Sequence, residues 1–290
     1  MVADLIKLAR PVQWIKNTIV LAPLVFAGQV LDTTKIEEAL VATAIFCLLS
    51  SAVYAFNDLI DRDQDRQHPL KKDRPLASGR VGTGTAVAFI VLLTVVGLVA
   101  AWLLHPGVFA VALAFLGLNA FYSLLLKNVV ILDAMSIGIS FVLRAYAGAV
   151  AIQVPASKWM LINTLLLALF LAFGKRRHEL MLLDQGATAH RRILGRYSAY
   201  LLDQCIGVTT ASVVVMYMLY SFSTEVSEKL GTEHLYLTIP FVIYGVFRYL
   251  YLIHKEERGG SPTQVLFTDR PILLDVVLWL LTCVVILYVV

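Results

Sequence analysis

The stretch IEEALVATAIFCLLSSAVYAFNDLIDRDQD, residues 36–65, joins an apolar run to a dense row of charged residues. The apolar part, residues 36–56, has the length of one bilayer crossing, which takes about 20 residues. The charged part continues to Arg80 and contains five aspartates and six lysines or arginines. Basic residues alone would anchor a membrane helix at its cytoplasmic end, so the aspartates need a separate reason.

The chain as a whole is too apolar for a soluble domain. Of its 290 residues, 59% are hydrophobic and 15% are charged, and the mean hydropathy is +0.78. Soluble domains contain about 45–50% apolar and about 25% charged residues. We therefore predict a polytopic membrane protein with one transmembrane domain, residues 1–290. An interfacial helix at residues 1–16 forms the start of this domain. The three cysteines lie in apolar runs without CxxC spacing, which favours a packing role.

Runs of about 20 mainly apolar residues predict nine transmembrane helices in an all-α fold. The predicted spans are residues 17–31, 36–56, 83–104, 107–126, 129–152, 157–174, 199–222, 235–254 and 271–290. The N-terminus and the loops after the even-numbered spans hold 19 of the 24 lysines and arginines, whereas the opposite loops hold three. This bias predicts a cytoplasmic N-terminus in the inner membrane. Two charged segments, residues 57–82 and 175–198, are then the predicted cytoplasmic active-site loops.

The acidic residues of the first loop have helical spacing. Asn57, Asp61 and Asp65 are four residues apart, so on a helix they share one face, with Asp58 at its edge. Stacked like charges cost stability unless a cation lies among them, and oxygen ligands with open positions suit Mg²⁺ held together with a substrate phosphate. A solvated loop with internal ion pairs is the alternative. Carboxylates at a membrane boundary need a partner, which favours the metal–diphosphate site.

The nonapeptide NDLIDRDQD, residues 57–65, resembles the NDxxDxxxD pattern of the UbiA superfamily of intramembrane prenyltransferases. Nine spans with a cytoplasmic N-terminus are also similar to that family, so the resemblance covers essentially the whole chain. It implies helices around a central cavity, a Mg²⁺-bound diphosphate at the cytoplasmic mouth and a lipid tail in the cavity. On the pattern positions it implies catalytic Asp58, Asp61 and Asp65, with Asn57, Asp61 and Asp65 on the metal.

One further segment departs from a typical prenyltransferase, and another carries a second signature. The family has a second pattern, DxxxD, at the end of span six, where this chain has GKRRHELMLLDQ with only Glu179 and Asp184 acidic. This segment, together with ARPVQWIKN at residues 9–17, resembles the decaprenyl-phosphate phosphoribosyltransferase branch. That resemblance implies transfer of 5-phosphoribose from phosphoribosyl pyrophosphate to a polyprenyl phosphate, with release of diphosphate, for synthesis of a cell-wall arabinose donor.

The chemistry of that branch requires more cations than prenyl transfer, because three phosphate-bearing groups meet in one site. Candidate phosphate-binding residues are Lys16, Lys71, Arg74, Lys127, Arg144, Lys175 and Arg176, with Arg191 and Arg192 as further positive groups. Candidate contacts to other substrate parts are Gln13, Asn17, Tyr122, Asp133, Glu179 and Tyr197. We expect catalysis by Mg²⁺ and electrostatics, since an oxocarbenium-like state at ribose C1 is helped by neutralising the departing diphosphate.

Several assignments have alternatives at this level. Tyr122 and Lys127 form a diphosphate-binding pair or are an interfacial tyrosine and a lysine reaching the membrane surface. Arg144, inside a predicted span, binds the lipid phosphate or donates to carbonyls of other helices. His68 and His178 are acid–base groups or polar loop residues.

The alternative functions are a UbiA-type transfer of a polyprenyl group from its diphosphate to an aromatic or lipid acceptor, and membrane transport. We expect no nucleic-acid partner. The oligomeric state stays open, a homo-oligomer included, as do the prenyl chain length and the number of Mg²⁺ ions.

Overall fold

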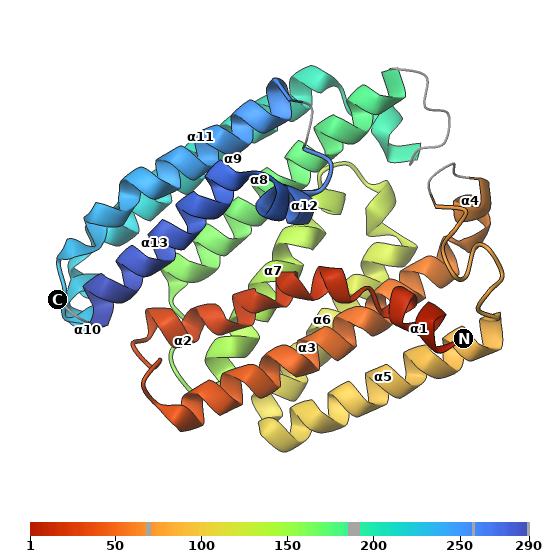
Figure 1. Ribbon diagram of the computed structural model, residues 1–290, viewed down its shortest axis with the longest axis horizontal. Helices are drawn as coiled ribbons and strands as arrows, with labels where there is room; N and C mark the ends of the chain where they lie inside the picture. The colour runs from red at the N-terminus through yellow and green to blue at the C-terminus, as the bar shows by residue number, and fades with distance from the viewer. Residues whose placement is uncertain (68–70, 185–191, 257–258, 289–290) are drawn as a thin grey trace.

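The computed structural model describes residues 1–67, 71–184, 192–256 and 259–288, and this part of the chain contains helices and no strand. Long helices run side by side from one end of the molecule to the other (Figure 1). The all-α fold predicted from the sequence is therefore confirmed.

The elements follow one another in a simple order. They are α1 (Val2–Ala9), η1 (Pro11–Leu21), α2 (Ala22–Phe26), α3 (Thr33–Ile60), α4 (Arg62–Gln67), α5 (Thr83–Leu104), α6 (Pro106–Leu124), η2 (Leu126–Asn128), α7 (Leu132–Ala151), α8 (Lys158–Asp184), η3 (Arg192–Arg196), α9 (Ala199–Ser221), α10 (Thr224–Leu230), η4 (His234–Thr238), α11 (Ile239–His254), α12 (Pro262–Thr268) and α13 (Arg270–Tyr288).

Eight helical segments of the described chain are long and apolar enough to cross a bilayer. They are α3, α5, α6, α7, the Lys158–Leu182 part of α8, α9, η4 with α11, and α13, and they coincide with eight of the nine predicted spans. Many of their leucines, valines and phenylalanines are exposed on the outside of the bundle. Because such a surface is stable only against lipid, the chain is a multi-pass membrane protein.

The remaining predicted span, residues 17–31, is not a continuous α-helix. The chain forms the 3₁₀-helix η1 over 11 residues and then α2 over five, with prolines at the start of both. A 3₁₀-helix rises about 2.0 Å per residue and an α-helix about 1.5 Å, so the pair extends about 30 Å. That length equals the thickness of a bilayer core, which is about 30 Å.

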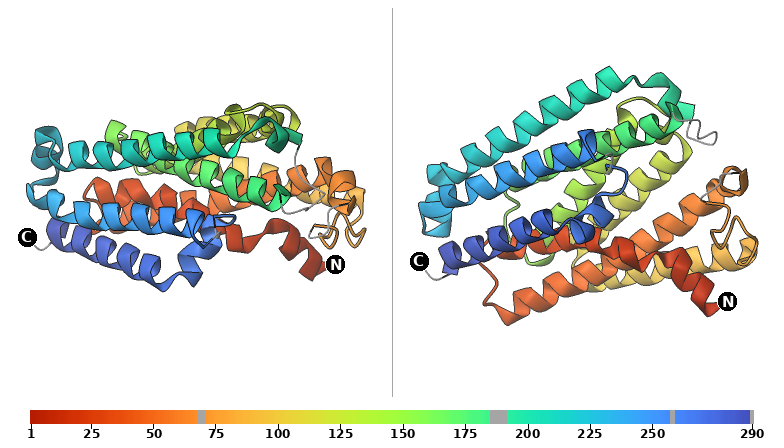
Figure 2. Two further views of the ribbon diagram at one scale, coloured as in Figure 1. Left: turned by 90° about the horizontal axis from the view of Figure 1, so that it is seen from above. Right: turned by 45° about the horizontal axis from the view of Figure 1, so that its top comes forward.

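The positions of the termini agree with a ninth crossing by η1 and α2. Figures 1 and 2 show the N- and C-termini at opposite ends of the molecule, with α1 and α4 near one end and α10 near the other. Eight crossings alone would return the chain to its starting side. The extended 3₁₀ geometry thus lets a short segment connect the two ends.

A close backbone contact holds η1 inside the bundle. This helix packs against both α3 and α7, and Asn17 and Val20 are fully buried there. On α7, Gly148 faces η1 so closely that a Cβ added to it would lie 2.0 Å from the carbonyl oxygen of Val20. Only a residue without a side chain permits this approach, so Gly148 sets the distance between the two helices.

Helical structure continues further into the charged segments than the sequence predicted. Helix α3 begins with Asp32, whose carboxylate caps the backbone N–H groups of Thr34 and Lys35. At its other end the backbone N–H of Asp61 donates to the carbonyl of Asn57 at 3.0 Å, and that of Asp65 donates to the carbonyl of Asp61 at 2.8 Å. The predicted single face is preserved across the junction of α3 and α4.

The second charged segment, residues 175–198, was predicted as a loop and is instead largely helical. Helix α8 continues to Asp184, and η3 follows after the gap in the described chain. Lys175, Arg176 and Glu179 therefore lie on a helix surface, where neighbouring residues point in different directions. The helix therefore points Lys175 and Arg176 in different directions, although they are neighbours in the sequence.

We expect Gly148→Ala to lower the free energy of unfolding by about 1–3 kcal/mol, because the new methyl group overlaps the backbone of η1. Gly117→Ala is the matched control, since its Cβ would meet no atom within 4 Å on the exposed side of α6. Thermal unfolding of both variants in the same detergent measures the difference. Equal melting temperatures for the two variants would contradict the packing of η1 against α7.

Candidate active site

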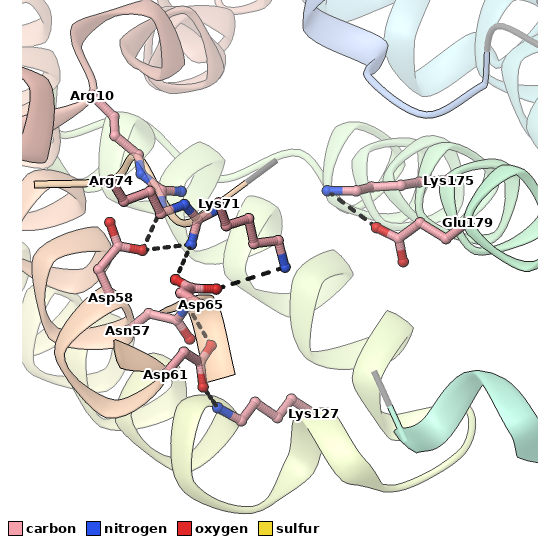
Figure 3. Close-up of polar contacts among 10 residues, drawn as sticks. All are labelled: Arg10, Asn57, Asp58, Asp61, Asp65, Lys71, Arg74, Lys127, Lys175 and Glu179. Atoms are coloured by element: carbon pink, nitrogen blue, oxygen red, sulfur yellow. Dashed lines mark hydrogen bonds and ion pairs between the residues drawn. The ribbon is translucent and has the colours of Figure 1, made fainter. Parts of the chain in front are cut away.

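The end of α3, together with α4, lies at one end of the bundle, where α1 and the segment after α4 also lie (Figure 1). Figure 3 shows Asp65 above Asp61 with Asp58 at their side, an aspartate stack that agrees with the predicted common face of Asn57, Asp61 and Asp65 and the edge position of Asp58. Basic side chains from four other segments approach this stack. The site is thus an alternation of carboxylates and cations at the end of the membrane helices.

Asp58 holds two arginines from distant parts of the chain. Its Oδ1 atom accepts hydrogen bonds from Arg10 at 2.5 Å and from Arg74 at 2.9 Å. Asp58 as a whole is only 2% exposed. Arg74 also donates to Asp65 at 2.6 Å, and the Lys71 ammonium lies 3.9 Å from the other oxygen of Asp65. Two charge-assisted bonds to one buried carboxylate orient both guanidinium groups firmly.

Arg10 lies within ARPVQWIKN, and the sequence did not predict a role for it in the site. It links α1 to η1 with a left-handed backbone, φ 53° and ψ 60°, which is uncommon for a residue other than glycine. A backbone of this kind costs about 1–3 kcal/mol and persists where surrounding contacts determine it. Its ion pair with Asp58 is such a contact. In the sequence, the only indication of this role was a charged residue directly before Pro11.

Asp61 faces a different set of partners. It accepts a hydrogen bond from the side-chain amide of Asn57 at 3.1 Å and pairs closely with the Lys127 ammonium group from η2. The carbonyl oxygen of the Asn57 side chain is buried and has no hydrogen-bond partner. A buried oxygen in this state normally costs about 1–3 kcal/mol, so its presence beside carboxylates calls for a ligand.

The donors of Asn57, Asp61 and Asp65 fit a hard divalent cation. All three offer oxygen atoms, and the unsatisfied oxygen of Asn57 is adjacent to the Asp61 carboxylate. Within the described residues, no three His, Cys, Asp or Glu side chains come close enough to hold a metal by themselves. A cation here would need further oxygens from a substrate, which is how Mg²⁺ is commonly held with phosphates.

Helix α8 faces the aspartate stack from the other side in Figure 3, and the region between them is called the opening, or mouth, of the bundle. Lys175 extends its ammonium group toward the aspartate stack, and its partner Glu179 lies one turn further along the helix (Figure 3). The two head groups are 3.8 Å apart and partly exposed. This wall contributes one exposed cation and one carboxylate to the mouth, in place of the paired aspartates of the family pattern.

Arg176 points away from the mouth into the bundle. It is 1% exposed and donates to Asp133 at 2.6 Å and to Glu179 at 2.7 Å. Tyr197 completes the network, because its hydroxyl donates to Asp133 at 2.7 Å and accepts from the backbone N–H of Ile131. Burial, together with the bond to the Asp133 carboxylate, raises the pKa of Tyr197, so the phenol stays protonated and keeps donating.

This network changes the interpretation of three predicted substrate contacts. Arg176, Asp133 and Tyr197 already satisfy one another across α8, α7 and the segment before α9. The geometry therefore favours a positioning role for these residues, with Glu179 as the member that reaches the opening. Direct contact of Arg176 with a phosphate stays a prediction.

Arg144 lies deeper, among neutral groups. It is 5% exposed and donates to Asn17 at 2.8 Å, to the carbonyl and hydroxyl oxygens of Ser140 and to the Ser50 hydroxyl at 3.3 Å. Its guanidinium also lies over the Phe115 ring, 4.5 Å from the centroid. Of the two alternatives, the structure supports hydrogen bonding to other segments, through the side chains of Asn17 on η1 and Ser50 on α3, and binding of the lipid phosphate by Arg144 stays a prediction.

The other predicted residues take less central positions. Lys16 and Gln13 lie on η1 and are half-buried, and Tyr122 lies near Arg176 at the end of α6. His178 lies against Gly260, so it packs between α8 and the segment before α12. Predictions for His68 and Arg191, and for the side chains of Asp184 and Arg192, lie outside the described residues.

Comparison with known proteins agrees with this geometry. A family model described as the UbiA prenyltransferase family matches residues 18–269. The decaprenyl-phosphate phosphoribosyltransferase of Mycobacterium tuberculosis is 32% identical over 97% of this chain and 93% of its own, and that of Mycolicibacterium smegmatis is 33% identical over 97% and 91%. A solved UbiA homolog from Archaeoglobus fulgidus, bound to GPP and Mg²⁺, superimposes with a TM-score of 0.72 at 16% identity, over 98% of this chain and 99% of its own.

We expect Asp133→Asn to destabilise the protein by about 3–5 kcal/mol, because it leaves the fully buried Arg176 without its closest counter-charge. Asp63→Asn is the matched control. The Asp63 side chain is 75% exposed in its pair with Arg62, and exposed pairs contribute about 0–1 kcal/mol. Unfolding in detergent, followed by intrinsic fluorescence, compares the two. A small effect for Asp133→Asn would show that this network does not hold the wall together.

Proposed function

The chain belongs to the UbiA prenyltransferase family, and we propose that it transfers 5-phosphoribose from phosphoribosyl pyrophosphate to a polyprenyl phosphate and releases diphosphate. The observation that carries the proposal is the near full-length similarity to curated decaprenyl-phosphate phosphoribosyltransferases. By that similarity the acceptor is decaprenyl phosphate and the product a lipid-linked 5-phosphoribose, a precursor of the cell-wall arabinose donor. The protein is thus a transferase, acting at the membrane that its helices cross.

The mouth of the bundle suits the diphosphate of the donor. Lys71, Arg74 and Lys127 are held by Asp65, Asp58 and Asp61, and Lys175 faces them from α8. Each of these cations can exchange a carboxylate for a phosphate oxygen, while the freed carboxylates of Asp61 and Asp65 become available to a metal. Such an exchange keeps every charge paired throughout, so entry of a strongly anionic donor does not leave a buried ion uncompensated.

Asn57, Asp61 and Asp65 are the residues that would hold Mg²⁺, as their oxygen donors and the unsatisfied Asn57 oxygen support. When bound there, Mg²⁺ would neutralise negative charge that builds up on the departing diphosphate. Asp58 has a different role in this proposal. It orients Arg10 and Arg74 toward the same phosphates and does not ligate the metal.

The reaction is a substitution at ribose C1. An oxygen of the polyprenyl phosphate forms a bond to C1, while the bond from C1 to the diphosphate oxygen breaks and its electron pair leaves with the diphosphate. The acceptor oxygen is already ionised at neutral pH, so no general base is needed. The protein's part is to hold the reacting atoms in line and to stabilise the leaving charge, which the dense ring of oriented cations can supply.

The alternative, transfer of a prenyl group from its diphosphate, is favoured by the GPP-bound fold neighbour. That likeness is at 16% identity and concerns the fold alone. On α8, Arg176 is turned inward and Lys175 faces the mouth. This second wall is more basic than two aspartates would be, which suits a donor that carries an additional phosphate.

Membrane placement follows from the same end of the bundle. The charged mouth lies at the end that holds the N-terminus, α4 and the end of α8 (Figure 1). The excess of lysines and arginines in these segments supports a cytoplasmic position of the mouth in the inner membrane. A water-soluble donor would then enter from the cytoplasm, and the lipid acceptor would enter from the bilayer.

We expect Asp61→Asn to reduce turnover by at least about 100-fold, because it removes a metal-ligating carboxylate and the partner of Lys127. The assay uses purified protein in detergent with radiolabelled phosphoribosyl pyrophosphate, Mg²⁺ and decaprenyl phosphate, and follows label in the lipid phase.

Asp63→Asn, two residues away on the exposed face of α4, is the control and should retain wild-type turnover. Removal of divalent cations with EDTA should abolish the wild-type activity, and added Mg²⁺ should restore it. Absence of labelled lipid with wild-type protein, together with product from decaprenyl diphosphate and an aromatic acid, would refute the proposed function.

A further inference from the structure

Two cations, Lys16 and Arg144, lie deeper in the bundle than the mouth, and neither pairs with a carboxylate of the described residues. Lys16, on η1, is half-buried, and its ammonium group has no hydrogen-bond or ion-pair partner among the described residues. It lies within electrostatic range of Arg144 below it and Arg10 above it, and both repel it. An unpaired lysine in a membrane bundle is costly, so a ligand that supplies negative charge is expected there.

A tyrosine, Tyr54, lies near the same two arginines. It lies on α3 close to Arg144 and Arg10, and the guanidinium of Arg10 sits over its ring, 5.4 Å from the centroid. In the described part of the chain its hydroxyl has no hydrogen-bond partner. Since a phenol in a protein interior normally finds one, this donor is available to a ligand.

Arg144 lies deeper than Tyr54, beside Ser50, which is on the same face of α3 as Tyr54. The groups to which it donates, Asn17, Ser50 and Ser140, are all neutral, and no described carboxylate pairs with it. Its charge is therefore held in place but not neutralised. Together with Lys16 it gives the interior a positive potential that the aspartates of the mouth, on the next turns of α3, do not cancel locally.

The spacing on α3 relates the two groups of cations. Ser50, Tyr54 and Asp58 are four residues apart and share one face of the helix. With a rise of about 1.5 Å per residue, Tyr54 lies about 6 Å deeper than Asp58. In a substitution at C1 the incoming and departing phosphates flank the sugar carbon on opposite sides, with reacting atoms about 3–3.5 Å apart. A separation of one helical turn matches that arrangement.

We propose that Lys16 and Tyr54, supported from below by Arg144, form a subsite for a phosphate monoester, separate from the diphosphate site at the mouth. This inference rests on the proposed function, in which two phosphate monoesters take part: the head group of the polyprenyl phosphate and the 5-phosphate of the ribose. The one-turn offset from Asp58 and the deeper position within the membrane bundle favour the lipid head group as the occupant.

The test uses full-length protein in detergent and measures KM separately for decaprenyl phosphate and for phosphoribosyl pyrophosphate. Lys16→Met removes the charge and retains most of the side-chain volume, and Tyr54→Phe removes only the hydroxyl. Lys16→Arg keeps the charge. Lys7→Met is the matched control, since Lys7 is exposed on α1 and lies in neither site.

A direct binding measurement with farnesyl phosphate as the probe, in the absence of donor, accompanies the kinetics. Melting temperature and elution volume identify any variant that fails to fold, and Tyr54→Phe, as the mildest change, keeps the test decisive in that case.

We expect Lys16→Met to raise KM for decaprenyl phosphate and to weaken farnesyl phosphate binding by about tenfold to 100-fold, as loss of a charge-assisted contact does. Tyr54→Phe should give a smaller loss in the same direction, Lys16→Arg should restore most of the affinity, and Lys7→Met should have no effect. KM for phosphoribosyl pyrophosphate should change less than threefold.

Other outcomes have distinct meanings. A rise confined to KM for phosphoribosyl pyrophosphate would support the subsite and assign it to the ribose 5-phosphate. Unchanged KM values and unchanged farnesyl phosphate binding in both Lys16→Met and Tyr54→Phe, in a wild-type enzyme that turns over, would overturn the subsite while leaving the proposed function intact. Failure of the wild-type protein to label lipid, with farnesyl phosphate binding that depends on Lys16, would overturn the function and leave the subsite.

Discussion

The site depends on the ion pairs that the buried carboxylate of Asp58 forms with two arginines. This carboxylate accepts hydrogen bonds from Arg10, which joins α1 to η1, and from Arg74, which follows α4. One negative charge therefore ties three segments of the chain together at the end of α3. A charge that is withdrawn from water must be paired, and satisfying it with two guanidinium groups also directs both of them toward the mouth.

The charged side chains of the two walls of the mouth are paired in different ways. On the α3–α4 wall, carboxylates and cations alternate, so that each can exchange its partner for part of a metal–diphosphate ligand. On the α8 wall, Arg176 pairs with Asp133 inside the bundle, and Lys175 pairs with Glu179 at the opening. The first wall thus has several ion pairs near the opening, whereas the second has a buried ion pair behind a partly exposed one.

The depth of the cations in the bundle indicates from which side the acceptor would approach ribose C1 in the proposed reaction. In that reaction the diphosphate of the donor would meet the mouth, and Tyr54, in the proposed monoester subsite, lies about one helical turn deeper than Asp58. An acceptor phosphate held at that depth would approach C1 from the side opposite the leaving group. The same arrangement would keep the lipid tail within the apolar part of the bundle, while the soluble donor enters from the charged end.

The sequence by itself determined the features that depend on local pattern. Apolar length predicted eight spans that the structure confirms, and helical periodicity predicted the common face of Asn57, Asp61 and Asp65. Motif resemblance predicted the family and its branch. These properties are readable because bilayer thickness and the 3.6-residue helical repeat act on neighbouring residues.

Only the tertiary structure decided which charges meet. Arg10 and Asp58 are 48 residues apart in the chain, Lys127 and Asp61 are 66 apart, and Arg144 and Asn17 are 127 apart. Local pattern carries no information on such pairs, because they depend on how helices pack. The replacement of a predicted first helix by η1 and α2 has the same origin, since the close contact with Gly148 and the burial of Asn17 hold that segment in place. Packing also turned Arg176 inward and left Lys16 without a counter-charge in the part of the chain that the structure describes.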